Sequence, residues 1–198
     1  MTGSLASRWQ TAFYEGLVAD VGLAETLRDA SLRADLKVWT SALTRAVVRS
    51  FESLQLRAAA KGYRSDILPL RQQEYLGQDV MVFASGAAGW QFPVGVCELE
   101  NAADDTRVAY SLWKTLCVRT QLRVVFCYRG DPGDAPTLVS TLADSVVRAL
   151  PVPERAKLEG DTLLAVGSRN EASTFPYGFF DTWKLNSNTG RFERFPRS

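Results

Sequence analysis

Apolar residues in the first third of the chain recur at steps of three or four positions, the spacing of one face of an α-helix. The positions that mark this face are Leu36, Trp39, Leu43, Val47, Phe51 and Leu54. They predict a long helix over 31–61, and Gly62 is well placed to end it. A similar spacing between Leu17 and Leu27 predicts helical structure before it.

Shorter apolar runs follow and predict strands. Residues 78–83 begin with two polar side chains and continue as Val-Met-Val-Phe, and residues 92–100 form a second such run. The segment between them, 84–91, contains two glycines and is typical of a hairpin loop. We therefore expect the two strands to be neighbours in one sheet.

The middle of the chain alternates helix and strand. Asp104 or Asp105 can cap a helix that runs to Thr120, and the almost continuous apolar run 122–128 suits a strand that is buried on both faces. A strand, a helix and a strand in this order predict a parallel pair inside a mixed sheet. The remaining predicted elements are a helix over 137–150, a strand over 162–166, and a terminal β-hairpin made of 178–185 and 191–195.

Composition places the chain among folded proteins. Of its 198 residues, 46% are hydrophobic, which is enough for a sizeable core. The net charge is +1, from 23 basic and 22 acidic residues, and this balance argues against binding of nucleic acid or membrane by bulk charge. We expect one α/β domain over 1–198, with a mixed central sheet flanked by helices and an extra C-terminal β-hairpin.

Several kinds of site are excluded or disfavoured by the residue types present. The chain has no histidine, which excludes Ser-His-Asp and Cys-His nucleophilic centres and histidine-containing zinc sites. The three cysteines, Cys97, Cys117 and Cys127, each lie in an apolar run and are predicted to be reduced core residues. Any metal would therefore be bound by oxygen, as Mg²⁺, Mn²⁺ and Ca²⁺ are.

Membrane and export signals are missing from the sequence as it stands. No apolar stretch approaches the about 20 residues of a membrane-spanning helix. The segment 1–9 also lacks the apolar centre of a signal peptide. These observations predict a cytoplasmic protein that does not contact a membrane.

Three carboxylates are candidates for chemistry. Asp79 begins one predicted strand, and Glu98 and Glu100 lie near the end of the next. Side chains at positions i and i+2 of a strand share a face, so Glu98 and Glu100 point the same way and Asp79 can lie beside them. Such charges repel one another unless a cation lies between them, and Mg²⁺ suits an oxygen-rich site. The following helix can direct Lys114 at the same patch, where its charge would stabilise a phosphoryl transition state.

This pattern resembles the PD-(D/E)XK superfamily of restriction-endonuclease-like nucleases. An acid begins a strand, an apolar strand ends in acid-x-acid, and a helix and another apolar strand follow; the residues that match are Asp79, the run 94–101, and 124–128. The resemblance covers 31–128 as a nuclease-like core, and 129–198 would complete the sheet with a helix and strands. It implies a restriction-endonuclease-like fold.

The resemblance also implies roles for individual residues. Asp79 and Glu98 would ligate Mg²⁺ or Mn²⁺, and Glu100 stands where most members have lysine. Lys114 would be a lysine that has moved to the following helix, as in some members. Gln78 stands where the motif has proline, and Glu52 matches an extra helix acid of some members.

Three functions follow as hypotheses. The first is a magnesium-dependent endonuclease that hydrolyses DNA in restriction, defence or repair. The second is a catalytically degenerate nuclease-fold protein that acts as a structural or protein-binding subunit, with a homodimer or another protein as partner. The third is an unrelated α/β domain. The aromatic residues Phe175, Tyr177, Phe179, Phe180 and Trp183 are expected in a core or interface, or alternatively on a stacking surface.

Overall fold

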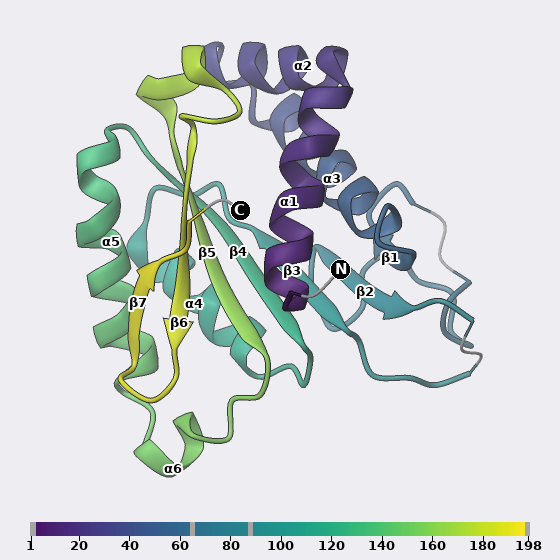
Figure 1. Ribbon diagram of the computed structural model, residues 1–198, viewed down its shortest axis with the longest axis vertical. Helices are drawn as coiled ribbons and strands as arrows, with labels where there is room; N and C mark the ends of the chain where they lie inside the picture. The colour runs from purple at the N-terminus through teal and green to yellow at the C-terminus, as the bar shows by residue number, and fades with distance from the viewer. Residues whose placement is uncertain (1–2, 64–65, 87–88, 197–198) are drawn as a thin grey trace.

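A seven-stranded mixed sheet forms the centre of the protein, and helices lie on both of its faces (Figure 1). The computed structural model describes residues 3–63, 66–86 and 89–196. The strands are β1 (Leu56–Ala60), β2 (Val80–Ala84), β3 (Gly95–Leu99), β4 (Leu122–Arg129), β5 (Asp161–Ser168), β6 (Phe180–Asn186) and β7 (Arg191–Arg194). They lie in the sheet in the order in which they occur in the chain.

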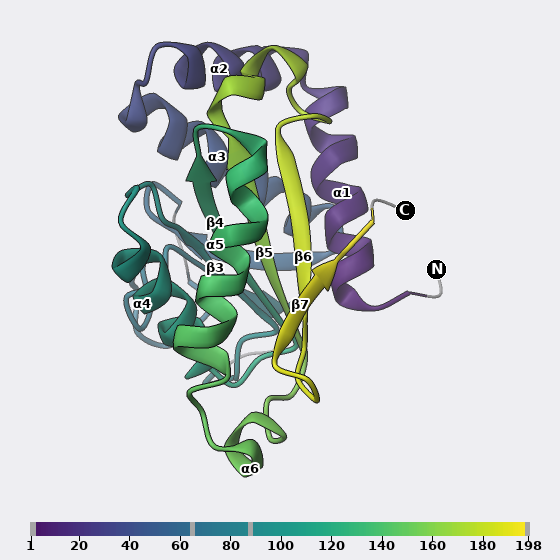
Figure 2. The same ribbon diagram turned by 90° about the vertical axis from the view of Figure 1, so that its left-hand side faces the viewer.

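The helices divide between the two faces. Their bounds are α1 (Leu5–Ala19), α2 (Val21–Leu32), α3 (Leu36–Glu52), α4 (Asp105–Leu116), α5 (Ala135–Leu142) and α6 (Val152–Arg155), with a π-helical turn at Ala143–Val147 and 3₁₀ turns at Pro132–Asp134 and Arg169–Thr174. Figures 1 and 2 show α1, α2 and α3 on one side of the sheet and α4 and α5 on the other.

The strand directions follow from the connections. β3 and β4 are parallel and joined through α4, and β4 and β5 are parallel and joined through α5. All other neighbours are antiparallel. The predicted parallel pair inside a mixed α/β sheet is therefore confirmed, and so is the terminal hairpin, which is formed by β6 and β7.

Each face of the sheet buries its own core. Between the sheet and α1 to α3, aromatic rings pack closely, as between Phe13 and Phe126, whose centroids are 5.7 Å apart. Phe179 and Phe180 belong to this core, as expected for part of the aromatic segment. The opposite face has a core under α4 and α5, which includes Val125 and Leu164, and a smaller separate cluster beside it, which includes Met81 and Val96. The alternation of side chains along each strand separates the two cores.

The long helix predicted over 31–61 is wrong. The chain turns between α2 and α3, where Ala34 has a φ of 53° and the Asp35 carboxylate accepts a hydrogen bond from the Val38 amide at 3.1 Å, capping α3. After α3 the chain reverses at Gln55, whose φ is 60°. Residues 56–60 then form the edge strand β1, because they pair with β2 instead of continuing the helix.

Smaller predictions also need correction. The helix expected over 137–150 begins at Ala135 and changes into a π-helical turn after Leu142. Cys97 and Cys127 are fully buried as expected, but Cys117 is exposed because it lies at the C-cap of α4. Among the residues that the structure describes, none of the helices combines the length and apolarity needed to cross a membrane.

Candidate functional site

Asp79 and Glu98 lie side by side at one end of β2 and β3. The antiparallel register pairs Val80 with Cys97, so the next position along places Asp79 opposite Glu98. The Asp79 amide lies 3.3 Å from Glu98 Oε1, and the Leu99 amide donates to Asp79 Oδ2 at 2.8 Å. The backbone hydrogen bonds of this strand end therefore hold both carboxylates.

Lys114 completes the cluster from the last turn of α4. Its Nζ lies 2.7 Å from Glu98 Oε2 and also donates to the Gly77 carbonyl oxygen at 2.7 Å. Glu98 is only 4% exposed and the Lys114 side chain is partly buried, so this largely buried ion pair joins β3 to the helix covering it. Removing one partner of such a pair leaves an uncompensated buried charge, which is strongly destabilising.

Glu100 is on the same side of the sheet as Glu98, as the alternation along the strand predicts. Its Oε2 accepts a hydrogen bond from the Ser111 hydroxyl of α4 at 3.2 Å, and its Oε1 accepts from the Ala102 amide at 2.8 Å. It therefore stands beside the Asp79–Glu98 pair, and its charge is close enough to contribute to raising the pKa of Asp79.

Burial controls the electrostatics of the pair. It raises the pKa of Glu98 to about 7, with the hydrogen bond from Lys114 opposing the rise and the charge of Asp79 adding to it. Burial also raises the pKa of Asp79, against the hydrogen bond from the Leu99 amide and the charge of Lys114. An acid with a pKa near neutrality next to a second acid and a lysine is typical of functional sites.

The oxygens present suit a hard cation in type but are already engaged. Both Glu98 oxygens have a partner, and both Glu100 oxygens accept hydrogen bonds. Within residues 3–63, 66–86 and 89–196, no group of three or more His, Cys, Asp or Glu side chains is arranged to bind a metal. Asp79 and Glu98 are the pair whose chemistry fits Mg²⁺ or Mn²⁺, and a cation there would replace Lys114 at Glu98 Oε2.

Two neighbouring amides were not predicted as site residues. Gln78 is 1% exposed, and neither polar atom of its side chain has a hydrogen-bond partner among the described residues. Asn101 donates from Nδ2 to the Thr40 hydroxyl at 2.8 Å, and its Oδ1 is likewise unpaired in the described part of the chain. Their only signal in the sequence is position, because one precedes Asp79 and the other follows Glu100.

Glu52 lies outside the cluster. It is the exposed last residue of α3, on the opposite side of the sheet from α4.

Comparison of the chain with protein-family models, with curated protein sequences and with solved structures gave no match. What the site does must therefore be inferred from its geometry and chemistry.

Proposed function

We propose that the chain is a metal-dependent phosphodiesterase that cleaves DNA in an active site formed by Asp79, Glu98 and Lys114. The observation that supports this most directly is the buried Glu98 carboxylate, which lies between a second acid and a lysine at one end of the sheet. The order of elements also fits the resemblance to restriction-endonuclease-like enzymes. An acid directly precedes β2, acid-x-acid follows in and after β3, and α4 leads to the parallel strand β4.

Each residue has a distinct role in this proposal. Asp79 and Glu98 would hold Mg²⁺ or Mn²⁺, which lowers the pKa of bound water and neutralises phosphate oxygens. Lys114, once released from Glu98, would place its ammonium group against the charge that develops on the phosphate. Glu100 would orient a water molecule while the Ser111 hydroxyl holds its carboxylate.

A second function deserves a test because one observation favours it. Glu98 is already neutralised by Lys114, and the described residues contain no ready cluster of three metal-binding side chains. In a catalytically degenerate nuclease-fold protein, the same ion pair would simply fasten α4 to the sheet. The two functions differ in whether a divalent cation can compete for Glu98.

Thermal melting with added Mn²⁺ separates these possibilities. A cation that binds only the folded protein raises the melting temperature by mass action, so wild type should be stabilised and Asp79→Asn and Glu98→Gln should not. Glu154→Gln is the matched control, because Glu154 forms a carboxylate–lysine pair with Lys157 on the exposed surface. A flat Mn²⁺ response in wild type would favour the degenerate protein.

Plasmid cleavage tests the chemistry itself. Glu98→Gln should lose activity by on the order of 10²-fold or more, while Glu154→Gln should cut like wild type. Lys114→Met should keep the Mn²⁺ response, since it frees a Glu98 oxygen, but should cut slowly. Equal cutting by wild type and Glu98→Gln would reject this site.

A further inference from the structure

A groove runs along the exposed side of α3, between α2 and the segment that follows β1. Its volume is about 1100 Å³. Three of the residues that line it are cationic, Lys37, Arg45 and Lys61, and none is acidic. Four further lining side chains, from α2 and α3, are threonine or serine hydroxyls. The hydroxyls of Thr26, Thr40 and Thr44 already donate to carbonyl oxygens of their own helices, so what the groove offers an occupant is chiefly the positive charge of its cationic side chains.

The charge of the groove is available to a ligand. Lys37 and Lys61 are exposed, and neither forms an ion pair with another described residue. Arg45 pairs with Asp20, but Arg49 shares that carboxylate, so two arginines face one acid. Because the protein as a whole has a net charge of only +1, these cations together with Lys37 and Lys61 are a local excess of positive charge. An anionic occupant with repeated charges complements such a surface, and the phosphate backbone of DNA has this chemistry.

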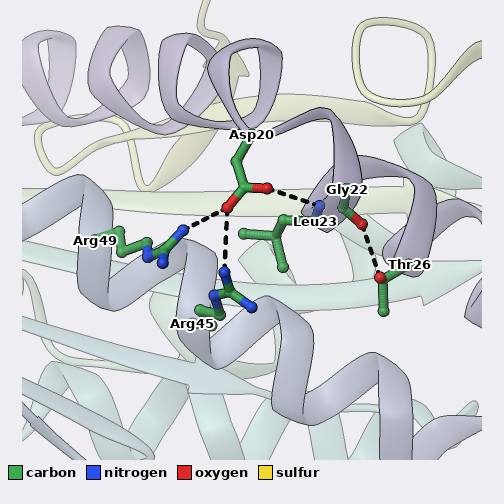
Figure 3. Close-up of polar contacts among 6 residues, drawn as sticks. All are labelled: Asp20, Gly22, Leu23, Thr26, Arg45 and Arg49. Carbon is green, nitrogen blue, oxygen red and sulfur yellow. Dashed lines mark hydrogen bonds and ion pairs between the residues drawn. The ribbon is translucent and has the colours of Figure 1, made fainter.

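Asp20 caps the first turn of α2 and links α2 to α3 beside the groove (Figure 3). One carboxylate oxygen of Asp20 accepts from the Leu23 amide at 3.0 Å. The other lies 3.2 Å from an Arg45 nitrogen and also pairs with Arg49. Leu23 and Arg45 both line the groove, so this contact sets the spacing between its α2 and α3 sides.

The groove reaches the same end of the sheet as the carboxylate pair. Ala60 pairs with Val80 and Val80 with Cys97, so the next positions, Lys61, Asp79 and Glu98, end three neighbouring strands side by side. On the other side of the groove, the Thr40 hydroxyl accepts a hydrogen bond from Asn101, which directly follows Glu100. The groove and the carboxylate pair therefore lie at one end of the sheet but on opposite faces, because Glu98 points toward α4 and the groove lies over α3. DNA bound in the groove would reach Asp79 and Glu98 by passing around this end of the sheet.

We propose that this groove binds the phosphate backbone of DNA through Lys37, Arg45 and Lys61 and leads it to the carboxylate pair. The delivery of DNA for cleavage rests on the proposed function, whereas binding in the groove does not. Binding is therefore measured without cleavage, in EDTA, by the fluorescence anisotropy of a short labelled duplex and of its single strand.

The salt dependence of binding gives a quantitative expectation. Three phosphate contacts with a duplex predict a slope of about −3 in log K against log[salt], which is a loss of roughly 40-fold between about 50 and 200 mM salt. Lys37→Gln/Lys61→Gln should bind more weakly and show a slope shallower by about 2. Both lysines are exposed and free of ion pairs with described residues, so the fold should be unaffected.

The control is Lys157→Gln/Arg191→Gln, which removes the same charge from exposed positions outside the groove. Equal binding by the groove and control variants would overturn the inference, and so would a wild-type protein that binds no DNA. Binding of a labelled polyglutamate peptide in place of DNA would overturn the choice of occupant. Groove-dependent DNA binding without any Glu98-dependent cleavage would leave the groove assigned and reject the nuclease.

Discussion

Glu98 is an acid that is almost completely removed from water and is still bonded to a cation. Its burial disfavours the charged form, and Lys114 at 2.7 Å only partly offsets this, so its pKa lies at about 7. Near neutral pH a proton therefore competes with Lys114 for the carboxylate. The ionic state of the pair, and with it the stability of the protein, should depend on pH in a range where ordinary carboxylates are fully ionised.

The first prediction concerns this dependence in Glu98→Gln. The folded pKa of Glu98 is raised from 4.5 to about 7, so the folded protein holds a proton that the unfolded chain has released. The stabilisation is complete below pH 4.5 and is lost as the pH rises through 7. In EDTA, the free energy of unfolding of wild type should fall relative to Glu98→Gln by about 3 kcal/mol over this range.

Urea unfolding of both proteins at a series of pH values measures this difference. Groups that titrate equally in the two proteins cancel, so only the effect of Glu98 remains. Glu154→Gln provides the control and should give a difference from wild type that hardly changes with pH, because Glu154 is exposed. A Glu98→Gln difference that is flat from pH 4.5 to 8 would show that Glu98 stays ionised throughout.

At the scale of residues, the sequence locates the acids but not their partners. Glu98 is conspicuous because it interrupts an apolar strand, and the alternation of side chains correctly places Glu98 and Glu100 on one side. The bonds that define the cluster join residues far apart in the chain, such as Lys114 and Gly77. The burial of Gln78 likewise depends on packing from other elements, which no local pattern of hydrophobicity contains.

At the scale of elements, β1 shows why local pattern misleads. Its residues Arg57-Ala58-Ala59-Ala60 are strong helix formers, and they follow a helix. Two things override this preference: Gln55 adopts a left-handed conformation that stops α3, and the free edge of β2 offers a full set of backbone hydrogen bonds. Strands with apolar runs, such as β4, were predicted correctly because they are buried on both faces.

The second prediction concerns how α4 is attached to the sheet. Arg123 of β4 is 2% exposed, and its guanidinium donates to the carbonyl oxygens of Thr115, Val118 and Glu159 at 2.7 to 3.0 Å. Arg123→Met would leave these carbonyls without their donor. We expect a loss on the order of 3 kcal/mol in the free energy of unfolding, because each unpaired buried polar group costs about 1–3 kcal/mol.

Chemical unfolding of Arg123→Met measures this loss, and Arg191→Met on the exposed side of β7 is its control. Arg123→Met should also increase amide hydrogen exchange in the last turn of α4, where Lys114 lies, because Arg123 holds that turn. If Arg123→Met and Arg191→Met have the same stability, the three carbonyl contacts contribute nothing measurable.

At the scale of the whole molecule, the sheet separates the core under α1 to α3 from the core under α4 and α5. A class of α/β protein with a mixed sheet follows from the alternation of helices and strands along the sequence, as predicted. The sequence pattern does not tell which helices cover which face of the sheet. That arrangement depends on the turns at Asp20 and Ala34 and on the connections through α4 and α5. Whether the two cores open together or separately is a property of the complete fold.

The cysteines give a direct test of this cooperativity. Cys97 lies in the core under α1 to α3, Cys127 lies in the core under α4 and α5, and Cys117 is exposed. Burial raises the pKa of Cys127 to about 12 and that of Cys97 well above its usual value, so neither thiol forms the reactive thiolate in the folded protein. A thiol reagent should therefore label one of the three cysteines under native conditions and all three after unfolding.

Labelling kinetics then decide between one cooperative unit and two. Cys117→Ser should show no rapid labelling, and its two remaining thiols should react at the same slow rate, because each is exposed only when the whole sheet unfolds. Mass spectrometry after brief labelling assigns the rate to each cysteine. If Cys127 reacts much faster than Cys97, the α4 and α5 side opens independently, and the Glu98–Lys114 pair would then not fasten α4 to the sheet strongly enough to couple the two cores.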